Sequence, residues 1–315
     1  MELILNNILS RIFLILRNNE KEVIYIKTNK KVKNEFSPFL KWAGGKRQIL
    51  NELEKHLPKE FNNYFEPFLG GGSFYFNLKS KNLIIGNSYL NDYNTELINT
   101  YQIIQNNPNR LLKYLEEYKQ KNSSEFFYEI RDWDRKNGFK YKSKIKRAAR
   151  FIYLNKTCFN GIWRVNSKGQ NNVPYGKNAN PSIYSEENIF SCNDILNKNT
   201  FLYSGDFKEI LKKAKKGDFI FLDPPYDPIS ETANFTSYNG FTFCRKMQED
   251  VYKTFKKLDK KGCYIMMTNN STKFIQDRFK DYISKYGENI IPVKRYINCQ
   301  GDKRNSVEEI IIKNY

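Results

Sequence analysis

Residues 217–226, GDFIFLDPPY, decide the fold of this 315-residue chain. The segment 219–222 is wholly apolar, which is typical of a short strand inside a parallel sheet. An acidic residue, two prolines and a tyrosine follow at 223–226, at the carboxyl end of the strand, where α/β sheets bind their ligands. The stretch therefore predicts an α/β fold with a functional site in this turn.

The alternation of strands and helices continues outward from this stretch. Runs of strand character, bounded by Gly, Asn and Asp, lie at 81–90, 261–270 and 307–315. Longer periodic stretches lie between these runs at 95–105, 109–120 and 245–261, and the last two have the apolar spacing and charged outer face of helices. We therefore expect a mainly parallel sheet with helices on both faces.

The composition favours nucleic acid as a partner. The chain has 53 Lys and Arg against 34 Asp and Glu, a net charge of +19, and 40% hydrophobic residues, so it folds and attracts polyanions. Its only histidine, His56, excludes a metal site with several imidazoles, and we place it in the exposed last turn of a helix. The five cysteines show no C-x-x-C spacing. We predict no metal, no disulfide framework and a cytoplasmic location.

The first 34 residues form a segment of their own. Asn6, Asn7, Ser10 and Arg11 interrupt its apolar run, which falls short of the ~20 apolar residues of a membrane span. Its isoleucines and leucines instead fit one face of a helix. We expect an amphipathic appendage and no membrane partner, with a functionless upstream stretch as the alternative.

Positive charge gathers in the middle of the chain. Residues 135–185 contain twelve Lys and Arg and no acidic residue. Within them, 142–156 has the pattern of a basic helix, and 158–177 has the turn signals and alternation of a hairpin. A charged run is usually a solvated surface. Because aromatic residues are interleaved with these charges, the pattern favours nucleic-acid contact.

The turn at 223–226 places two hydrogen-bond acceptors side by side. Consecutive prolines hold the backbone extended and leave carbonyl oxygens to which no local amide can donate a hydrogen bond. The Asp223 carboxylate and such a carbonyl together suit an NH2 group, and Tyr226 can stack on a flat ring. An ordinary turn from strand to loop also tolerates this sequence, so the four residues alone leave both interpretations open.

Two further motifs bear on a nucleotide-like ligand. Residues 65–73, FEPFLGGGS, contain three consecutive glycines before a helix-like segment, where backbone can approach a ligand closely. Asp92 follows the next strand and can bind the hydroxyls of a ribose, or else cap a helix. Residues 41–46, KWAGGK, do not form a phosphate loop, because Leu40 and Arg47 stand where Gly and Ser or Thr are required. ATP hydrolysis is therefore disfavoured.

Taken in order, these motifs resemble those of the Dam-type DNA adenine-N6 methyltransferases, the alpha-group, type II enzymes with a D-P-P-Y loop. The resemblance covers residues 36–315. It is carried by FLKWAGGK (39–46), FEPFLGGGS (65–73), NDYN (91–94), LNKTCFNGIWRVN (154–166), GDF (205–207), DPPY (223–226) and NFTSY (234–238).

The resemblance implies a Rossmann-like class I S-adenosylmethionine-dependent methyltransferase with an inserted domain of helices and a β-hairpin that recognises DNA. The implied division is an appendage at 1–34, a catalytic domain at 35–105 and 195–315, and a target-recognition insert at 106–194. The implied catalytic residues are Asp223, Pro224, Pro225 and Tyr226. The implied contacts to the cofactor, S-adenosyl-L-methionine, are Trp42, Lys46, Phe68, Gly70, Gly72, Asp92, Asp206, Phe207 and Asp223. The implied contacts to DNA are Lys41, Phe159, Asn160, Ile162 and Arg164.

The reaction that the resemblance implies is methyl transfer to N6 of a flipped adenine in double-stranded DNA, within 5′-GATC-3′. Phe159 stands where the family often has tyrosine, so a hydrogen bond from that hydroxyl is missing here. Methylation of cytosine N4 or of RNA, and a non-catalytic nucleic-acid binder on the same fold, are the alternatives. Whether a companion restriction endonuclease acts on the same site is left open.

Overall fold

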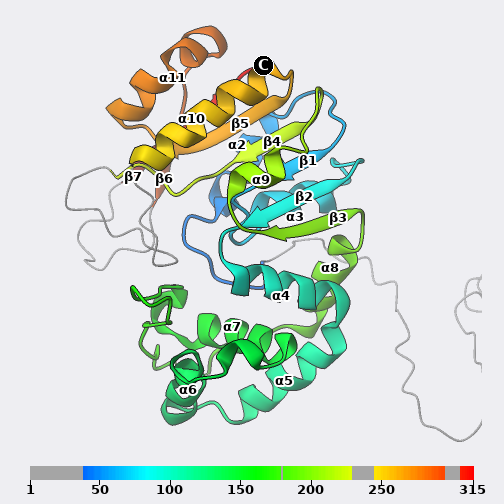
Figure 1. Ribbon diagram of the computed structural model, residues 1–315, viewed down its shortest axis with the longest axis vertical. Helices are drawn as coiled ribbons and strands as arrows, with labels where there is room; N and C mark the ends of the chain where they lie inside the picture. Colours follow the sequence, from blue (N-terminus) through cyan, green and yellow to red (C-terminus); the bar gives the residue numbers. More distant parts are fainter. Residues whose placement is uncertain (1–37, 179, 229–244, 295–305) are drawn as a thin grey trace, which may run out of the picture. The chain divides into compact units, whose positions relative to one another are not determined.

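A seven-stranded sheet organises the part of the chain that the computed structural model describes, residues 38–178, 180–228, 245–294 and 306–315 (Figure 1). In chain order its strands are β1 (Tyr64–Glu66), β2 (Ser88–Asp92), β3 (Thr200–Ser204), β4 (Phe219–Leu222), β5 (Tyr264–Asn270), β6 (Asn289–Lys294) and β7 (Ser306–Lys313). Across the sheet they run β3-β2-β1-β4-β5-β7-β6, and β7 runs antiparallel to the other six strands. The parallel order 3-2-1-4-5 is that of Rossmann-like folds, as predicted.

Helices cover both faces of the sheet because β4 is apolar on both. Phe219 and Phe221 pack into one cluster with α2, α3 and α4, whereas Ile220 and Leu222 pack into another with α9, α10 and α11 (Figure 1). The bounds of these helices are α2 (Leu50–Lys55), α3 (Ser73–Ser80), α4 (Thr95–Asn106), α9 (Phe207–Leu211), α10 (Arg245–Lys260) and α11 (Lys273–Tyr286). The predicted two-sided architecture is confirmed.

A group of helices lies beyond the β3 edge of the sheet (Figure 1). It contains α5 (Pro108–Gln120), α6 (Ser124–Arg131), α7 (Lys144–Thr157) and α8 (Glu186–Leu196). The basic helix α7 is its centre, because ten of its fourteen residues are buried. The sheet and these helices belong to one compact unit, Phe36–Tyr315. The three-part domain division stays a prediction.

The segment after α7 folds back on itself, as its turn signals predict. Two isolated antiparallel bridges join Cys158 to Tyr175 and Val165 to Asn171. Gly169, at the tip, has a φ of +74°. The pairing is therefore that of a hairpin, without the continuous strands that the alternation suggested. We call residues 158–177 the recognition hairpin, after the role that the family resemblance implies for them.

Three expectations need correction or lie outside the described residues. The strand expected at 81–90 begins only at Ser88, because Gly86 lies against the Asn62 carbonyl, where an added Cβ would be 1.8 Å from the oxygen. Ile85, before this turn, is 89% exposed. His56 follows the last residue of α2, but its side chain is only 14% exposed. The amphipathic helix expected within 1–34 lies outside the described residues, and among the described helices none is long and apolar enough to cross a membrane.

Candidate active site

A cavity of about 800 Å3 lies at the carboxyl ends of β1, β2, β3 and β4. All the residues that the sequence implied for catalysis and cofactor binding line it: Trp42, Lys46, Phe68, Gly70, Gly72, Asp92, Asp206, Phe207, Asp223, Pro224, Pro225 and Tyr226. Ile162 of the recognition hairpin lines it as well. Residues far apart in the sequence therefore meet at the edge of the sheet where the α/β rule expects a ligand.

The carboxylate of Asp223 is held by two side chains. Lys46 Nζ lies 2.9 Å from Oδ2, and Thr268 Oγ1 donates a hydrogen bond of 2.7 Å to Oδ1. The buried Lys46 ammonium also donates to the Gly44 carbonyl at 2.7 Å and lies 4.7 Å from the centroid of the Tyr226 ring. Because a carboxylate has about four acceptor positions, Asp223 can accept a further donor from the cavity.

A network of side-chain amides holds the backbone of the loop 223–227. Gln248 Nε2 donates to the Pro225 carbonyl at 2.8 Å, and Gln248 Oε1 accepts from Asn269 Nδ2 at 3.2 Å. Asn269 Oδ1 accepts from the backbone N–H of Asp227 at 3.0 Å. The Pro224 carbonyl accepts no hydrogen bond from the residues that the structure describes. The loop thus offers a carbonyl beside a fixed carboxylate, the acceptor pair that the sequence suggested.

The glycine loop after β1 makes room for Trp42. Gly70 has a φ of +49°, and a Cβ added there would lie 2.7 Å from Trp42 Nε1. Gly72, with a φ of +64°, is the N-cap of α3, as the helix-like segment predicted. The indole also stacks on Phe151 of α7, with the ring centroids 6.2 Å apart. The loop and the helical insert therefore meet at this one tryptophan.

Asp92 is positioned by the glycine loop at the end of β2. Its Oδ2 accepts from the Gly70 backbone N–H at 2.9 Å, and its Oδ1 accepts from the Asn94 N–H at 2.8 Å. Burial raises the pKa of this carboxyl. The residue that caps α4 is Asn94, so the alternative in which Asp92 caps a helix is wrong. Asp92 is instead a carboxylate on the cavity wall.

The opposite wall of the cavity is aromatic. Phe68 and Phe207 pack with ring centroids 4.9 Å apart at an interplanar angle of 32°. Asp206 is the N-cap of α9, and its side chain accepts from the Lys208 backbone N–H at 2.9 Å. The Asp206-Phe207 pair therefore presents a polar edge and an apolar face to the cavity.

Glu66 is a candidate that the sequence analysis passed over. It ends β1, lines the cavity and is 3% exposed, and the Tyr64 hydroxyl donates to its Oε2 at 2.7 Å. Burial raises its pKa to about 8, against the opposing effect of the Tyr64 hydrogen bond, and the nearby Asp223 carboxylate adds to the rise. The FEPFLGGGS motif contains this residue, but its burial beside Asp223 arises only when β1 and β4 pair.

Asn155 is a second residue that the sequence did not single out. From α7 its side chain accepts from the Lys41 N–H at 2.8 Å and donates to the Lys41 carbonyl at 2.8 Å and to the Gly161 carbonyl at 3.1 Å. It is fully buried. Lys41 thereby lies against the turn of the recognition hairpin, as the implied set of DNA contacts requires.

The remaining implied DNA contacts lie on the surface rather than in the cavity. Phe159 is 51% exposed, and Asn160 is exposed with a φ of 56°. Arg164 is also exposed, and its Nε donates to Asn172 Oδ1 at 2.8 Å across the recognition hairpin. These three side chains can therefore reach a macromolecule that the cavity could not admit.

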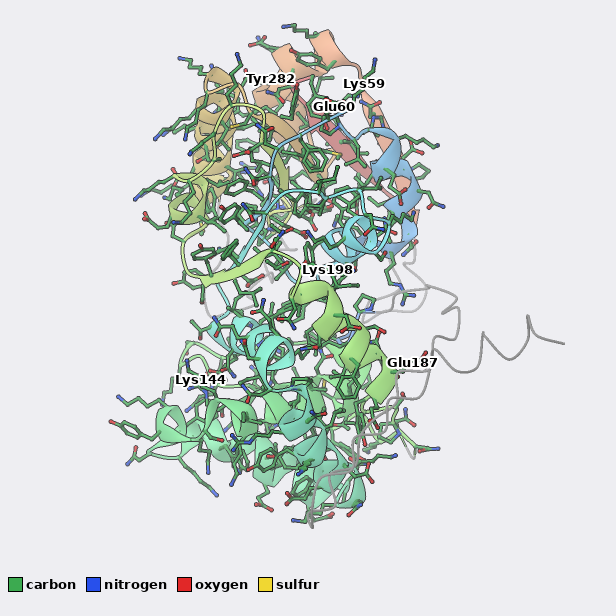
Figure 2. All side chains as sticks on the ribbon, turned by 90° about the vertical axis from the view of Figure 1, so that its right-hand side faces the viewer. Lys59, Glu60, Lys144, Glu187, Lys198 and Tyr282 are labelled. Carbon is green, nitrogen blue, oxygen red and sulfur yellow. The ribbon has the colours of Figure 1, made fainter. Side chains whose placement is uncertain are left out.

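Part of the positive charge of 135–185 is neutralised from outside that segment. Arg147 pairs with Glu96, and both Arg135 and Arg150 pair with Asp134. The lack of acidic residues within the segment therefore does not leave all twelve of its charges without a partner. The other nine Lys and Arg of the segment have no carboxylate partner in the described part of the chain; Lys144, at the start of α7, is an exposed example (Figure 2).

The fold and the cavity are those of a Rossmann-like α/β protein with a pocket large enough for a nucleotide and a group of helices beside the sheet that includes the basic helix α7. Residues 42–298 match the model of the D12 class N6 adenine-specific DNA methyltransferases. The match spans more than half of the chain, so the protein belongs to this family and is an adenine-specific DNA methyltransferase. The resemblance found in the sequence is thereby confirmed, and so is the methyltransferase fold.

Curated relatives match over nearly the whole chain. A type II methyltransferase of Lactococcus lactis subsp. cremoris, M1.LlaDCHI, is 40% identical over 287 residues, 90% of this chain and 98% of its own length. The type II methyltransferase M.MjaIII of Methanocaldococcus jannaschii is 38% identical over 89% of this chain and 100% of its own. The DNA adenine methylase of Escherichia coli K12 is 28% identical over 87% of this chain and 93% of its own.

Proposed function

We propose that this enzyme transfers the methyl group of S-adenosyl-L-methionine to N6 of an adenine flipped out of duplex DNA, within 5′-GATC-3′. The observation that carries the proposal is the loop at the end of β4. There the Asp223 carboxylate lies beside a Pro224 carbonyl that no described residue claims, and Tyr226 completes the wall of the cavity. Two acceptors and an aromatic ring suit a planar base with an exocyclic NH2 group.

The cavity fits S-adenosyl-L-methionine. Its volume of about 800 Å3 is within the range of cofactor sites. Asp92 would accept the ribose hydroxyls, and the apolar face of Phe68 and Phe207 would receive the adenine ring of the cofactor. A Cβ at Gly70 would fill the cradle beside Trp42. When bound, the cofactor supplies an electrophilic methyl group on a sulfonium.

The loop prepares the nitrogen that receives the methyl group. The lone pair of an adenine amine is delocalised into the ring, so the amine is a poor nucleophile. Hydrogen bonds from its two protons to Asp223 and to the Pro224 carbonyl would draw the nitrogen toward tetrahedral geometry and free the lone pair. As N6 gains the methyl group it would give up one of these two protons, for which the Asp223 carboxylate is the acceptor, so this chemistry needs no histidine, metal or covalent intermediate. Most of the acceleration would come from positioning and electrostatics.

Access to the base requires extrusion from the helix, since N6 lies inside a stacked duplex. Unstacking costs a few kcal/mol, and stacking on the Tyr226 ring would offset part of that free energy. The recognition hairpin supports this arrangement, because Ile162 lines the cavity while the neighbouring Arg164 is exposed. A base that enters the cavity would thus leave its neighbours within reach of the hairpin.

The family match and the residues of the cavity argue against the two alternatives, a cytosine-N4 enzyme and a non-catalytic binder. Cytosine-N4 enzymes usually carry serine at the position of Asp223, and the family model that matches is adenine-specific. A non-catalytic binder would have no need of the carboxylates at Asp92 and Asp223, both of which line the cavity. Assays of methylation and of sequence specificity distinguish these functions.

A methylation assay tests the reaction. Purified protein should transfer label from radiolabelled S-adenosyl-L-methionine to a GATC duplex, and not to the same duplex already methylated at both adenines. Asp223→Ala should lower kcat by about 100- to 1,000-fold. Absence of transfer, or wild-type turnover by Asp223→Ala, contradicts the proposal. Single-molecule sequencing of DNA from an expressing host identifies both the base and the motif.

Arg164 provides the test of specificity. A bidentate contact from its guanidinium to guanine O6 and N7 is worth about 1–3 kcal/mol, so Arg164→Ala should lower kcat/KM on GATC by about 5- to 150-fold and relax discrimination at one base pair. The assay compares duplexes that differ at each position of the site. Equal weakening on every duplex would make Arg164 a phosphate contact instead.

We further propose a companion restriction endonuclease and a cytoplasmic location. Two relatives bear the name type II methyltransferase, which supports the first proposal. Cys158, Cys192 and Cys263 are free and buried, which agrees with a reducing compartment. DNA from a host that lacks the enzyme should be cut by an extract of the native host, and DNA from an expressing host should resist.

A further inference from the structure

The Tyr226 side chain is fixed at both of its ends. Its hydroxyl donates a hydrogen bond of 2.8 Å to Glu309 Oε2 on β7. The preceding Pro225 carbonyl accepts from Gln248 of α10 at 2.8 Å. A tyrosine has only two side-chain torsions, so a fixed backbone and a fixed hydroxyl together determine the plane of the ring.

Glu309 stands on a rigid part of the sheet. It is in register with Asn270 of β5 on one side and with Ile291 of β6 on the other, so β7 is paired along both edges at this residue. Glu309 is 7% exposed and lines the cavity. The adjacent Glu308 is exposed, because successive side chains of a strand point to opposite faces.

A buried carboxylate at this position needs a physical reason. Removal of a carboxylate from water is unfavourable unless donors replace the water, and a phenol hydroxyl is a strong donor to a carboxylate. Burial, followed by the Asp223 and Glu309 charges, raises the pKa of Tyr226 well above its usual value, so the hydroxyl keeps the proton that it donates. The hydrogen bond therefore has a fixed direction, from Tyr226 to Glu309.

We infer that Glu309 is a positioning residue that sets the plane of the Tyr226 ring for stacking on the target base. The inference rests on the proposed function. In this role Glu309 acts through the tyrosine hydroxyl rather than on the base directly. Through Glu309 the antiparallel strand β7 takes part in substrate positioning, in addition to its pairing in the sheet.

Five variants, one of them a control, test the inference in the methylation assay. Loss of a hydrogen bond to a charged group corresponds to about 10- to 100-fold in rate, so Glu309→Ala should lower kcat by that factor with KM for the cofactor nearly unchanged. Glu309→Gln keeps an acceptor oxygen and should recover most of the activity. Tyr226→Phe should match Glu309→Ala, and the double variant should be no worse than either single one. Glu308→Ala is the matched control and should behave as wild type.

A fluorescence measurement separates positioning from general damage. 2-Aminopurine at the target adenine brightens when it leaves the helix and is quenched when an aromatic ring stacks on it. With saturating enzyme, Glu309→Ala should leave the probe brighter than wild type does, at an unchanged Tm. Full activity of Glu309→Ala, additive losses in the double variant, or no rescue by Glu309→Gln each overturns the inference. Failure of the wild type itself to methylate would instead contradict the proposed function.

Discussion

At the scale of single residues, Glu66 makes the stability of the protein depend on pH. Burial raises its folded-state pKa to about 8 from the usual 4.5, so between these values the folded protein keeps a proton that the unfolded chain has released. The free energy of unfolding therefore falls as pH rises through this window. Glu66→Gln removes the titration, and its stability relative to wild type should rise by at most about 1.4 kcal/mol per pH unit.

Denaturant unfolding of the cofactor-free protein at pH 5, 6, 7 and 8 measures this difference. Glu60→Gln, at an exposed position before β1, is the control (Figure 2). A difference between Glu66→Gln and wild type that stays constant over the series would show that Glu66 is ionised throughout.

Glu66 and Glu309 also mark the limit of sequence reasoning about single residues. Asp223 and Tyr226 could be predicted because their chemistry lies within four consecutive residues. The hydrogen bond from Tyr226 to Glu309 joins residues 83 positions apart. No local pattern distinguishes the buried Glu309 from the exposed Glu308 beside it, since only the placement of β7 between β5 and β6 decides which side faces the cavity.

At the scale of elements, α7 connects Lys41 to the recognition hairpin through Asn155. Replacement by alanine leaves Lys41 and Gly161 with backbone groups that lose their partners, which costs about 1–3 kcal/mol each when they stay dry. We expect Asn155→Ala to lower Tm and to weaken binding to a GATC duplex more than binding to the cofactor.

Calorimetry with each ligand separates these two effects. Asn106→Ala, at an exposed position in α4, serves as the control and should alter neither affinity. Equal loss of both affinities in Asn155→Ala would indicate general unfolding rather than displacement of the hairpin.

The sequence predicts some helices and strands more accurately than others. The helices α5 and α10 follow their apolar periodicity closely, because each buries one face, whereas α4 is buried on most sides. The strand expected at 81–90 was wrong in its first half, because a turn against Asn62 interrupts an apolar run that looks continuous. Apolar content alone does not say whether a run such as Leu83 to Ile85 is covered by the rest of the fold.

At the scale of the whole molecule, the fold determines which charges remain for DNA. Of the twelve Lys and Arg in 135–185, three pair with carboxylates, and the other nine have no carboxylate partner among the described residues. Each phosphate contact contributes about −0.9 to the slope of log K against log salt. If this segment makes the phosphate contacts, the slope for a duplex should be no steeper than about −8, whereas twelve free charges would allow about −11.

Two lysine variants test which charges reach the phosphates. Lys168, exposed beside the tip of the recognition hairpin, has no carboxylate partner among the described residues, whereas Lys121 lies 2.7 Å from Glu117 at the end of α5. Lys168→Gln should reduce the slope by about 0.9 and weaken binding equally on all sequences, and Lys121→Gln should leave it unchanged. Fluorescence anisotropy between 50 and ~200 mM salt measures both. An unchanged slope for Lys168→Gln would show that the tip of the recognition hairpin makes no phosphate contact, because a charge that displaces no counterion cannot bind a phosphate.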